Sequence, residues 1–191
     1  MHSAFRRFTC FVATIFAVLI ASGNSARTKV LVVEKLATCS APNSDKYVIR
    51  LPNPLNFTSV NNKLQIYGNL TVMEVIQEPL EVVFVTNRCS LDMKTCEPFN
   101  KRTLPRICSY INEEKGSWAT FFRSFEPDVR CPIKPNVYTF GNISVDLTFA
   151  TIFALDGYRW QAYLKLFSSG KQKRELLCVS VQFWMKWVKR A

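Results

Sequence analysis

The chain has 191 residues, with 25 Lys and Arg against 14 Asp and Glu, and a formal net charge of +11. Its single histidine is His2, inside an N-terminal segment that we expect to be cleaved, which excludes histidine-based catalysis and histidine-ligated zinc from the mature chain. Carboxylates that could form a catalytic pair are interpreted as solvated loop residues: Glu113, Glu114, Glu126 and Asp128. We therefore expect neither an enzyme nor a cofactor or metal site.

Residues 1–25 are typical of a secretory signal peptide. Arg6 and Arg7 precede an uncharged apolar run over residues 8–21, and small residues follow it as a signal peptidase requires. The alternative, a membrane anchor, needs roughly 20 apolar residues, and this run is shorter. We expect residues 26–191 to form a single secreted domain with a formal charge of +9, since cleavage removes two arginines and no acid.

Cysteines and sequons agree with secretion. Cleavage would also remove Cys10, leaving an even set that favours disulfides over metal ligation: Cys39, Cys89, Cys96, Cys108, Cys131 and Cys178. Six cysteines allow 15 pairings, and only Cys89 with Cys96 gives a short closure. Three Asn-x-Ser/Thr sequons predict glycosylation at Asn56, Asn69 and Asn142.

In chain order, the first half predicts strands at 27–36, 47–51, 63–76 and 80–86. The third alternates most clearly, with Leu64, Ile66 and Val72 on one face. Residues 89–131 change character and predict a disulfide-linked connection. Within it, 104–111 has weak helical spacing and 117–125 a stronger helical pattern that Ser117 could cap.

The second half returns to alternation. Residues 137–140 predict a strand that ends at Gly141, and 145–153 predict the next, with Phe149 and Phe153 on one face. Asp156-Gly157 predicts a turn before strands at 158–166 and 177–185. The whole pattern favours an all-β, immunoglobulin-like sandwich or cup of about 7–8 antiparallel strands, with a disulfide-linked connection that carries short helix.

The aromatics of 117–125 have two interpretations. They recur at steps of three, one and three, and they are either core residues or the lid of an apolar cavity. As candidate ligand-contacting residues we take Trp118, Phe121, Phe122 and Phe125, with four residues of the later strands as walls: Phe149, Phe153, Trp160 and Leu164.

A resemblance adds to this interpretation. Cys131-Pro132, Tyr138 and Asn142 stand in the spacing C-P-x-x-x-x-x-Y-x-x-x-N, and the strand that begins at Gly157-Tyr158 and the late Cys178 follow. This pattern resembles a family of secreted insect proteins, some associated with gustatory and pheromone-sensing organs, which are similar to the ML lipid-recognition superfamily that includes the ganglioside activator protein. It implies a sandwich that opens between its sheets to hold acyl chains. It also implies three disulfides: Cys39–Cys178, Cys89–Cys96 and Cys108–Cys131.

We therefore expect a secreted protein that binds a lipid or another hydrophobic small molecule, as a carrier or presenter in insect chemosensation. The alternative is an extracellular protein-interaction module with a filled core and no ligand cavity. The charge of +9 is either a solvated, solubilising surface or an attraction to anionic lipid or a membrane surface. A membrane surface or a receptor is a further candidate partner. Nucleic acid is not expected as a partner, because the chain has no recognition motif.

Overall fold

The computed structural model describes residues 27–39, 47–52, 54–115, 119–170 and 172–189. The chain divides into two compact units. The larger unit, Lys29–Lys186, carries all that follows. The smaller one combines residues 1–28 and 187–191, and only the outer ends of the first and last strands are described in it. The predicted signal peptide, residues 1–25, lies outside the described residues, and the single domain over 26–191 stays a prediction.

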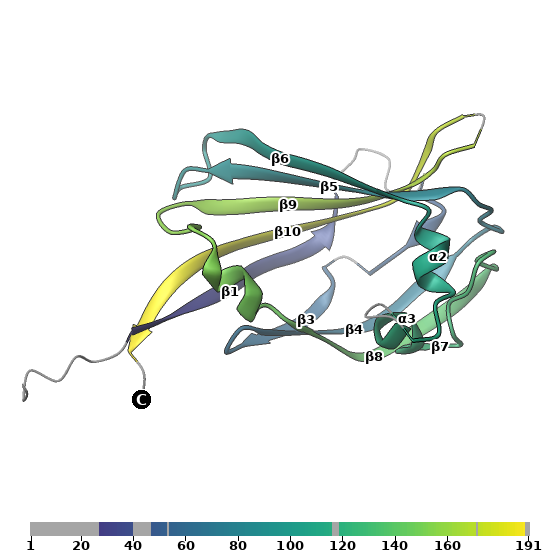
Figure 1. Cartoon of the computed structure of the whole chain (residues 1–191), viewed down its shortest axis with the longest axis horizontal. Coiled ribbons are helices and arrows are strands. Elements are labelled where there is room, and N and C mark those ends of the chain that lie inside the picture. Colours follow the sequence, from purple (N-terminus) through teal and green to yellow (C-terminus); the bar gives the residue numbers. More distant parts are fainter. Residues whose placement is uncertain (1–26, 40–46, 53, 116–118, 171, 190–191) are drawn as a thin grey trace, which may run out of the picture. The chain divides into compact units, whose positions relative to one another are not determined.

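Two antiparallel sheets form the larger unit (Figure 1). Sheet A has the strand order β1 (Arg27–Thr38), β10 (Arg174–Lys189), β9 (Arg159–Ser168), β5 (Leu80–Cys89) and β6 (Cys96–Pro105). Sheet B has the order β2 (Ile49–Arg50), β4 (Lys63–Val72), β8 (Asn136–Asp146) and β7 (Phe125–Glu126), and β3 (Asn56–Val60) also pairs with β4. The all-β sandwich predicted from the sequence is confirmed.

The core lies between the sheets because apolar side chains alternate along the strands. One buried cluster joins Leu80 and Val82 of β5 to Val72 of β4 and Phe140 of β8. A second, smaller cluster joins β1, β4 and β10 through Leu31, Leu64 and Met185 respectively. The predicted inward face of residues 63–76 is therefore correct. Among the described residues, no helix is long and apolar enough to cross a membrane.

Two strand predictions in the second half were wrong. β8 does not end at Gly141 but continues to Asp146, and residues 148–152 form the 3-10 helix η2 (Thr148–Ile152) instead of a strand. β8 ends at Asp146 because its partner strand β4 begins at Lys63, directly opposite, and so offers no residue to pair with those beyond Asp146. The Asp146 carboxylate then accepts a hydrogen bond from the Thr148 N–H at 2.8 Å, which starts the turn.

The sequence patterns missed β3, β6 and the short β7, whereas β2 lies within the predicted strand at 47–51. The described residues form ten strands instead of about 7–8. β6 escaped prediction because it is exposed along nearly its whole length and has no apolar alternation. It contains Pro98 and ends at Pro105, and proline within sheets is found on edge strands, at strand starts or at bulges. β6 is indeed the edge of sheet A.

The connection between residues 89 and 131 carries two short helices, α2 (Ile107–Ile111) and α3 (Ala119–Arg123), as the helical spacing predicts. Figure 1 shows both helices at one end of the sandwich, with the turn of the β5–β6 hairpin at the other. The Ser124 hydroxyl and N–H both donate to the Phe121 carbonyl, at 2.6 and 3.2 Å, and so terminate α3. The expected cap, Ser117, lies outside the described residues.

Three disulfides join the pairs that the resemblance implies: Cys39–Cys178, Cys89–Cys96 and Cys108–Cys131. Cys39–Cys178 ties the end of β1 to β10, and the Cys39 N–H donates to the Cys178 carbonyl at 3.0 Å. Cys108–Cys131 ties α2 to the segment before β8. There Asn112 accepts a hydrogen bond from the Cys131 N–H at 2.9 Å.

Loop length predicts how much each of two disulfides stabilises the fold. Cys39–Cys178 spans 139 residues and Cys89–Cys96 spans 7. Chain entropy then assigns them about 5 and about 2 kcal/mol. We expect the double variant C39A/C178A to lower the free energy of unfolding by at least twice as much as C89A/C96A, as measured by guanidinium unfolding of the secreted chain. Equal losses would contradict the entropic account.

Candidate functional site

The inward face of β5 changes from buried to exposed along its length. Leu80 and Val82 belong to the core cluster, and Phe84, two residues further on, lies on the same face because side chains alternate in a strand. Phe84 is nevertheless 37% exposed. An aromatic ring on the inner side of a sandwich and still open to solvent is the starting point of the site.

Strand register places neighbours on both sides of Phe84. Leu164 of β9 pairs with it on one side and Arg102 of β6 on the other. The next inward row of side chains comes from the same three strands: Ala162, Thr86 and Asn100. All six are partly or fully exposed. We call these two rows, Leu164–Phe84–Arg102 and Ala162–Thr86–Asn100, the open strip.

The core closes the end of the open strip that points toward α2. The preceding row is Leu166, Val82 and Leu104, and it belongs to the core cluster or packs against it. Phe121 and Phe122 of α3 pack against that same cluster. Their rings meet edge to face at 5.1 Å.

A chain of ring contacts links α3 to sheet B. The Phe121 ring lies 5.7 Å from that of Phe125 in β7, which lies 5.3 Å from that of Phe140 in β8. Edge-to-face and tilted contacts of this kind stabilise beyond the area they bury. These three rings therefore attach the short helix to the core of the sandwich.

Trp160 closes the other end of the open strip. It lies on the inward face of β9 and is 2% exposed. Its ring packs edge to face against Phe99 at 4.9 Å, and its Nε1–H donates to the Leu155 carbonyl at 2.9 Å. A buried indole with its donor satisfied is a rigid wall.

The arginine of the open strip, Arg102, differs from the neighbouring Arg88 in its charged and aromatic partners. Arg88, at the Trp160 end, pairs with Glu97 and lies over the Tyr158 ring at 4.7 Å. Arg102 is exposed, and its side chain has no hydrogen bond or ion pair with any described residue. The open strip thus combines an apolar row with one positive charge that no neighbouring acid neutralises.

Of the candidate ligand-contacting residues, Trp160 and Leu164 border or belong to the open strip. Phe121, Phe122 and Phe125 are not placed in the strip: Phe125 is buried in the core cluster, and the other two pack partly buried against that cluster. Trp118 lies outside the described residues.

The structure does not bring Phe149 and Phe153 to this group. They lie in or next to η2 and are 61% and 52% exposed. The residues around η2 pack against the second core cluster, through Ala150 and Leu147, instead of the first. The expected wall at these two positions depended on a strand that does not form.

Sequence reasoning missed Phe84 and Arg102. Phe84 could have been found from the alternation of β5, because it follows Leu80 and Val82 at a spacing of two and so shares their face. Arg102 gave no such signal, since β6 was not recognised as a strand and the face of its side chains follows only from pairing with β5.

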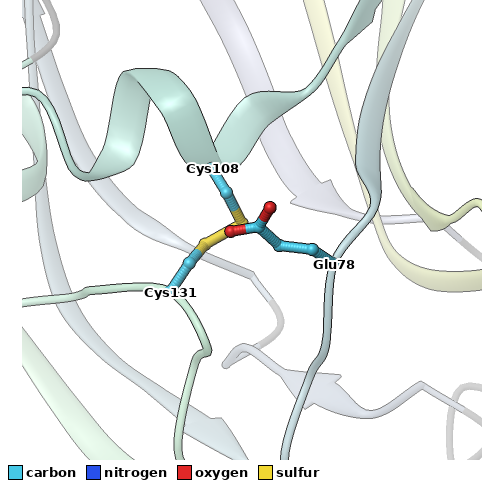
Figure 2. A group of neighbouring side chains, drawn as sticks. All are labelled: Glu78, Cys108 and Cys131. Atoms are coloured by element: carbon cyan, nitrogen blue, oxygen red, sulfur yellow. A yellow bond between two sulfur atoms is a disulfide. The ribbon is translucent and has the colours of Figure 1, made fainter.

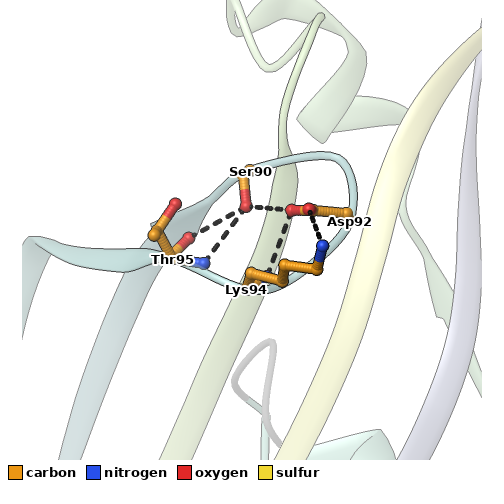
Figure 3. Close-up of polar contacts among 4 residues, drawn as sticks. All are labelled: Ser90, Asp92, Lys94 and Thr95. Carbon is orange, nitrogen blue, oxygen red and sulfur yellow. Dashed lines mark hydrogen bonds and ion pairs between the residues drawn. The ribbon is translucent and has the colours of Figure 1, made fainter.

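A polar network organises the hairpin turn beyond Trp160 (Figure 3). The Ser90 hydroxyl donates to the Asp92 carboxylate at 2.6 Å and accepts from the Thr95 N–H at 3.2 Å. The Lys94 N–H also donates to Asp92, at 3.2 Å. These bonds, that from Ser90 first and that from the Lys94 N–H second, lower the pKa of Asp92 below its usual value.

One group of possible metal ligands occurs among the described residues: Glu78, Cys108 and Cys131 (Figure 2). Both sulfurs belong to the Cys108–Cys131 disulfide. Cysteine binds metals as the thiolate, so the oxidised pair offers no such ligand and leaves a single exposed carboxylate.

The sequons gather on sheet B. Asn56 is exposed at the start of β3, Asn69 is exposed in β4, and Asn142 lies in β8 with its side chain outside the described part. A depression of about 270 Å³ lies beside the β3–β4 hairpin, lined by Thr58, Val60, Asn61, Lys63 and Gln65. Neither feature involves the strands of the open strip. Glycosylation at the three sites stays a prediction.

Comparison with known proteins returned no matching family model and no matching curated protein.

The Ser90 bond predicts a titration shift. In S90A we expect the pKa of Asp92 to rise toward its usual value, as measured by NMR of the side-chain carboxyl. Because the folded protein has the lower Asp92 pKa, the ionised carboxylate stabilises the fold above the usual carboxyl pKa, and this stabilisation is lost as the pH falls through the lowered value. S90A should therefore reduce the loss of stability over this acidic pH range. K94A is the control and should shift the pKa less, because its N–H remains. An unchanged Asp92 in S90A would refute the assignment.

Proposed function

We propose that the chain is a secreted protein that binds a hydrophobic small molecule, and that the apolar part of the ligand lies on the open strip. The observation that carries the proposal is the 37% exposure of Phe84 on the inward face of β5. Leu164 beside it supplies further apolar surface, and the buried Trp160 closes one end of the strip. Sites for hydrophobic molecules combine apolar surface with a few polar groups, and the strip combines three apolar residues with three polar ones.

The energetics favour a chain-like ligand. Burying each methylene group is worth about 0.8 kcal/mol, so an acyl chain that covers the Leu164–Phe84 row gains several kcal/mol. The ring also loses its contact with water. Walls that are already in place add to affinity, because little order is lost when the ligand binds.

The wider role rests on the sequence. The predicted signal peptide, the sequons and the three disulfides support secretion, since disulfides persist in oxidising compartments. The resemblance to secreted insect proteins similar to the ML superfamily supports a lipid or related ligand, with a role as carrier or presenter in chemosensation. We propose binding without catalysis.

A second candidate function is an extracellular protein-interaction module. Exposed apolar side chains around η2 favour it: Phe149, Ile152 and Phe153. Such patches often mark contact surfaces. In that case the open strip would hold no ligand, and η2 would contact a protein partner.

The first test is native mass spectrometry of the secreted, deglycosylated chain, with solvent extraction of bound molecules and then titration with laurate and dodecanol. We expect a 12-carbon ligand to bind. The variant F84A should weaken its affinity about tenfold, which corresponds to the loss of roughly 1–2 kcal/mol of apolar contact.

F149A is the matched control, because it removes an exposed phenylalanine from η2 and should leave affinity unchanged. Thermal unfolding checks that both variants fold. A double variant F121A/F122A that weakens uptake while secretion stays normal would extend the site to α3. Binding of neither ligand, or equal effects of F84A and F149A, would contradict the open strip.

A further inference from the structure

We infer that the ligand is an amphiphile with an anionic head group, and that Arg102 contacts that head group. The inference deepens the proposed function and rests on it, because the open strip must first hold an apolar chain. Its starting point is the row Leu164–Phe84–Arg102, which passes from apolar to cationic across three paired strands.

The register of β5 and β6 places the apolar Phe84 beside the cationic Arg102. Arg102 pairs directly with Phe84, and side chains on one face of directly opposed residues have Cβ atoms about 5 Å apart. Because β6 is the edge strand, Arg102 stands at the rim of the strip and Leu164 stands further in. A ligand whose chain covers Leu164 and Phe84 would therefore bring its head to the guanidinium.

The positive charge of Arg102 is not neutralised by another described residue. Arg102 forms no ion pair with another described residue, whereas Arg88 on the same face of the hairpin is already paired with Glu97. The nearest inward neighbours along the strip, Thr86 and Asn100, carry no charge. Thus no acid in the strip itself would repel an anionic head.

The planar guanidinium of Arg102 suits an oxyanion. A guanidinium stays charged at every physiological pH and presents a fork of donors that matches a carboxylate or phosphate in two parallel bonds. The rim position leaves room for such a head group, since Arg102 is exposed. A neutral alcohol or hydrocarbon of the same length would lose this contact and keep the apolar one.

The preceding residue supplies a matched control. Lys101 pairs with Val85 and so lies on the outward face of the same strand. It is also exposed and also cationic. Reversal of its charge changes the net charge by the same amount as reversal at Arg102, but on the other face of sheet A.

The test uses the full secreted chain and measures affinity for three probes by calorimetry: laurate, dodecanol and inorganic phosphate. Wild type should bind laurate at least about fivefold tighter than dodecanol, and higher salt should narrow the difference. R102E should weaken laurate about tenfold and leave dodecanol unchanged. K101E should change neither by more than about twofold, and R102K should keep most of the laurate affinity.

The outcomes separate the two proposals. If laurate and dodecanol bind equally and R102E has no effect, the anionic head is refuted while the hydrophobic site stands. If K101E weakens laurate as much as R102E, net charge and not Arg102 is responsible. If phosphate alone binds in an Arg102-dependent way, the site takes free anions and not amphiphiles. If no probe binds, the proposed function itself fails.

Discussion

The register of β5 between β9 and β6 is the constraint on which the site depends. A slip of one residue would turn Phe84 outward, bring Val85 inward and separate the apolar row from Arg102. Two features fix the register from opposite ends. Leu80 and Val82 are held in the core, and the Cys89–Cys96 disulfide joins residues that are themselves paired at the hairpin.

The aromatic rings of the sandwich differ in how far they are buried, and this distinguishes three positions for them. Phe125 and Phe140 are core, Trp160 is a wall, and Phe84 is an exposed surface that faces inward. For the α3 aromatics the structure bears on the core interpretation alone. Phe121 and Phe122 pack partly buried against the core cluster, as the core interpretation expects, and the lid stays a prediction.

The sequence predicted what depends on local alternation. The strands that begin at Lys63 and Leu80, the turn at Asp156-Gly157 and the short helices follow from spacing and are present, although the first strand ends at Val72 and not at Ile76. Two kinds of feature could not be predicted. The end of β8 at Asp146 depends on where β4 begins, and the inward face of Arg102 depends on its pairing with β5. Both are set by partners distant in sequence, so a pattern within one segment carries no signal of them.

The position of β6 at the edge of sheet A gives its cations another consequence. An edge strand leaves backbone donors and acceptors open to a strand from a second chain, and charged residues and prolines oppose that addition. Lys101 and Arg102 place a positive charge on each face, and Pro98 removes one donor. Replacement of Arg102 by an apolar residue to suit a neutral ligand would therefore also remove a barrier to edge-to-edge aggregation. The proposed ligand preference and the resistance to aggregation would then depend on the same strand.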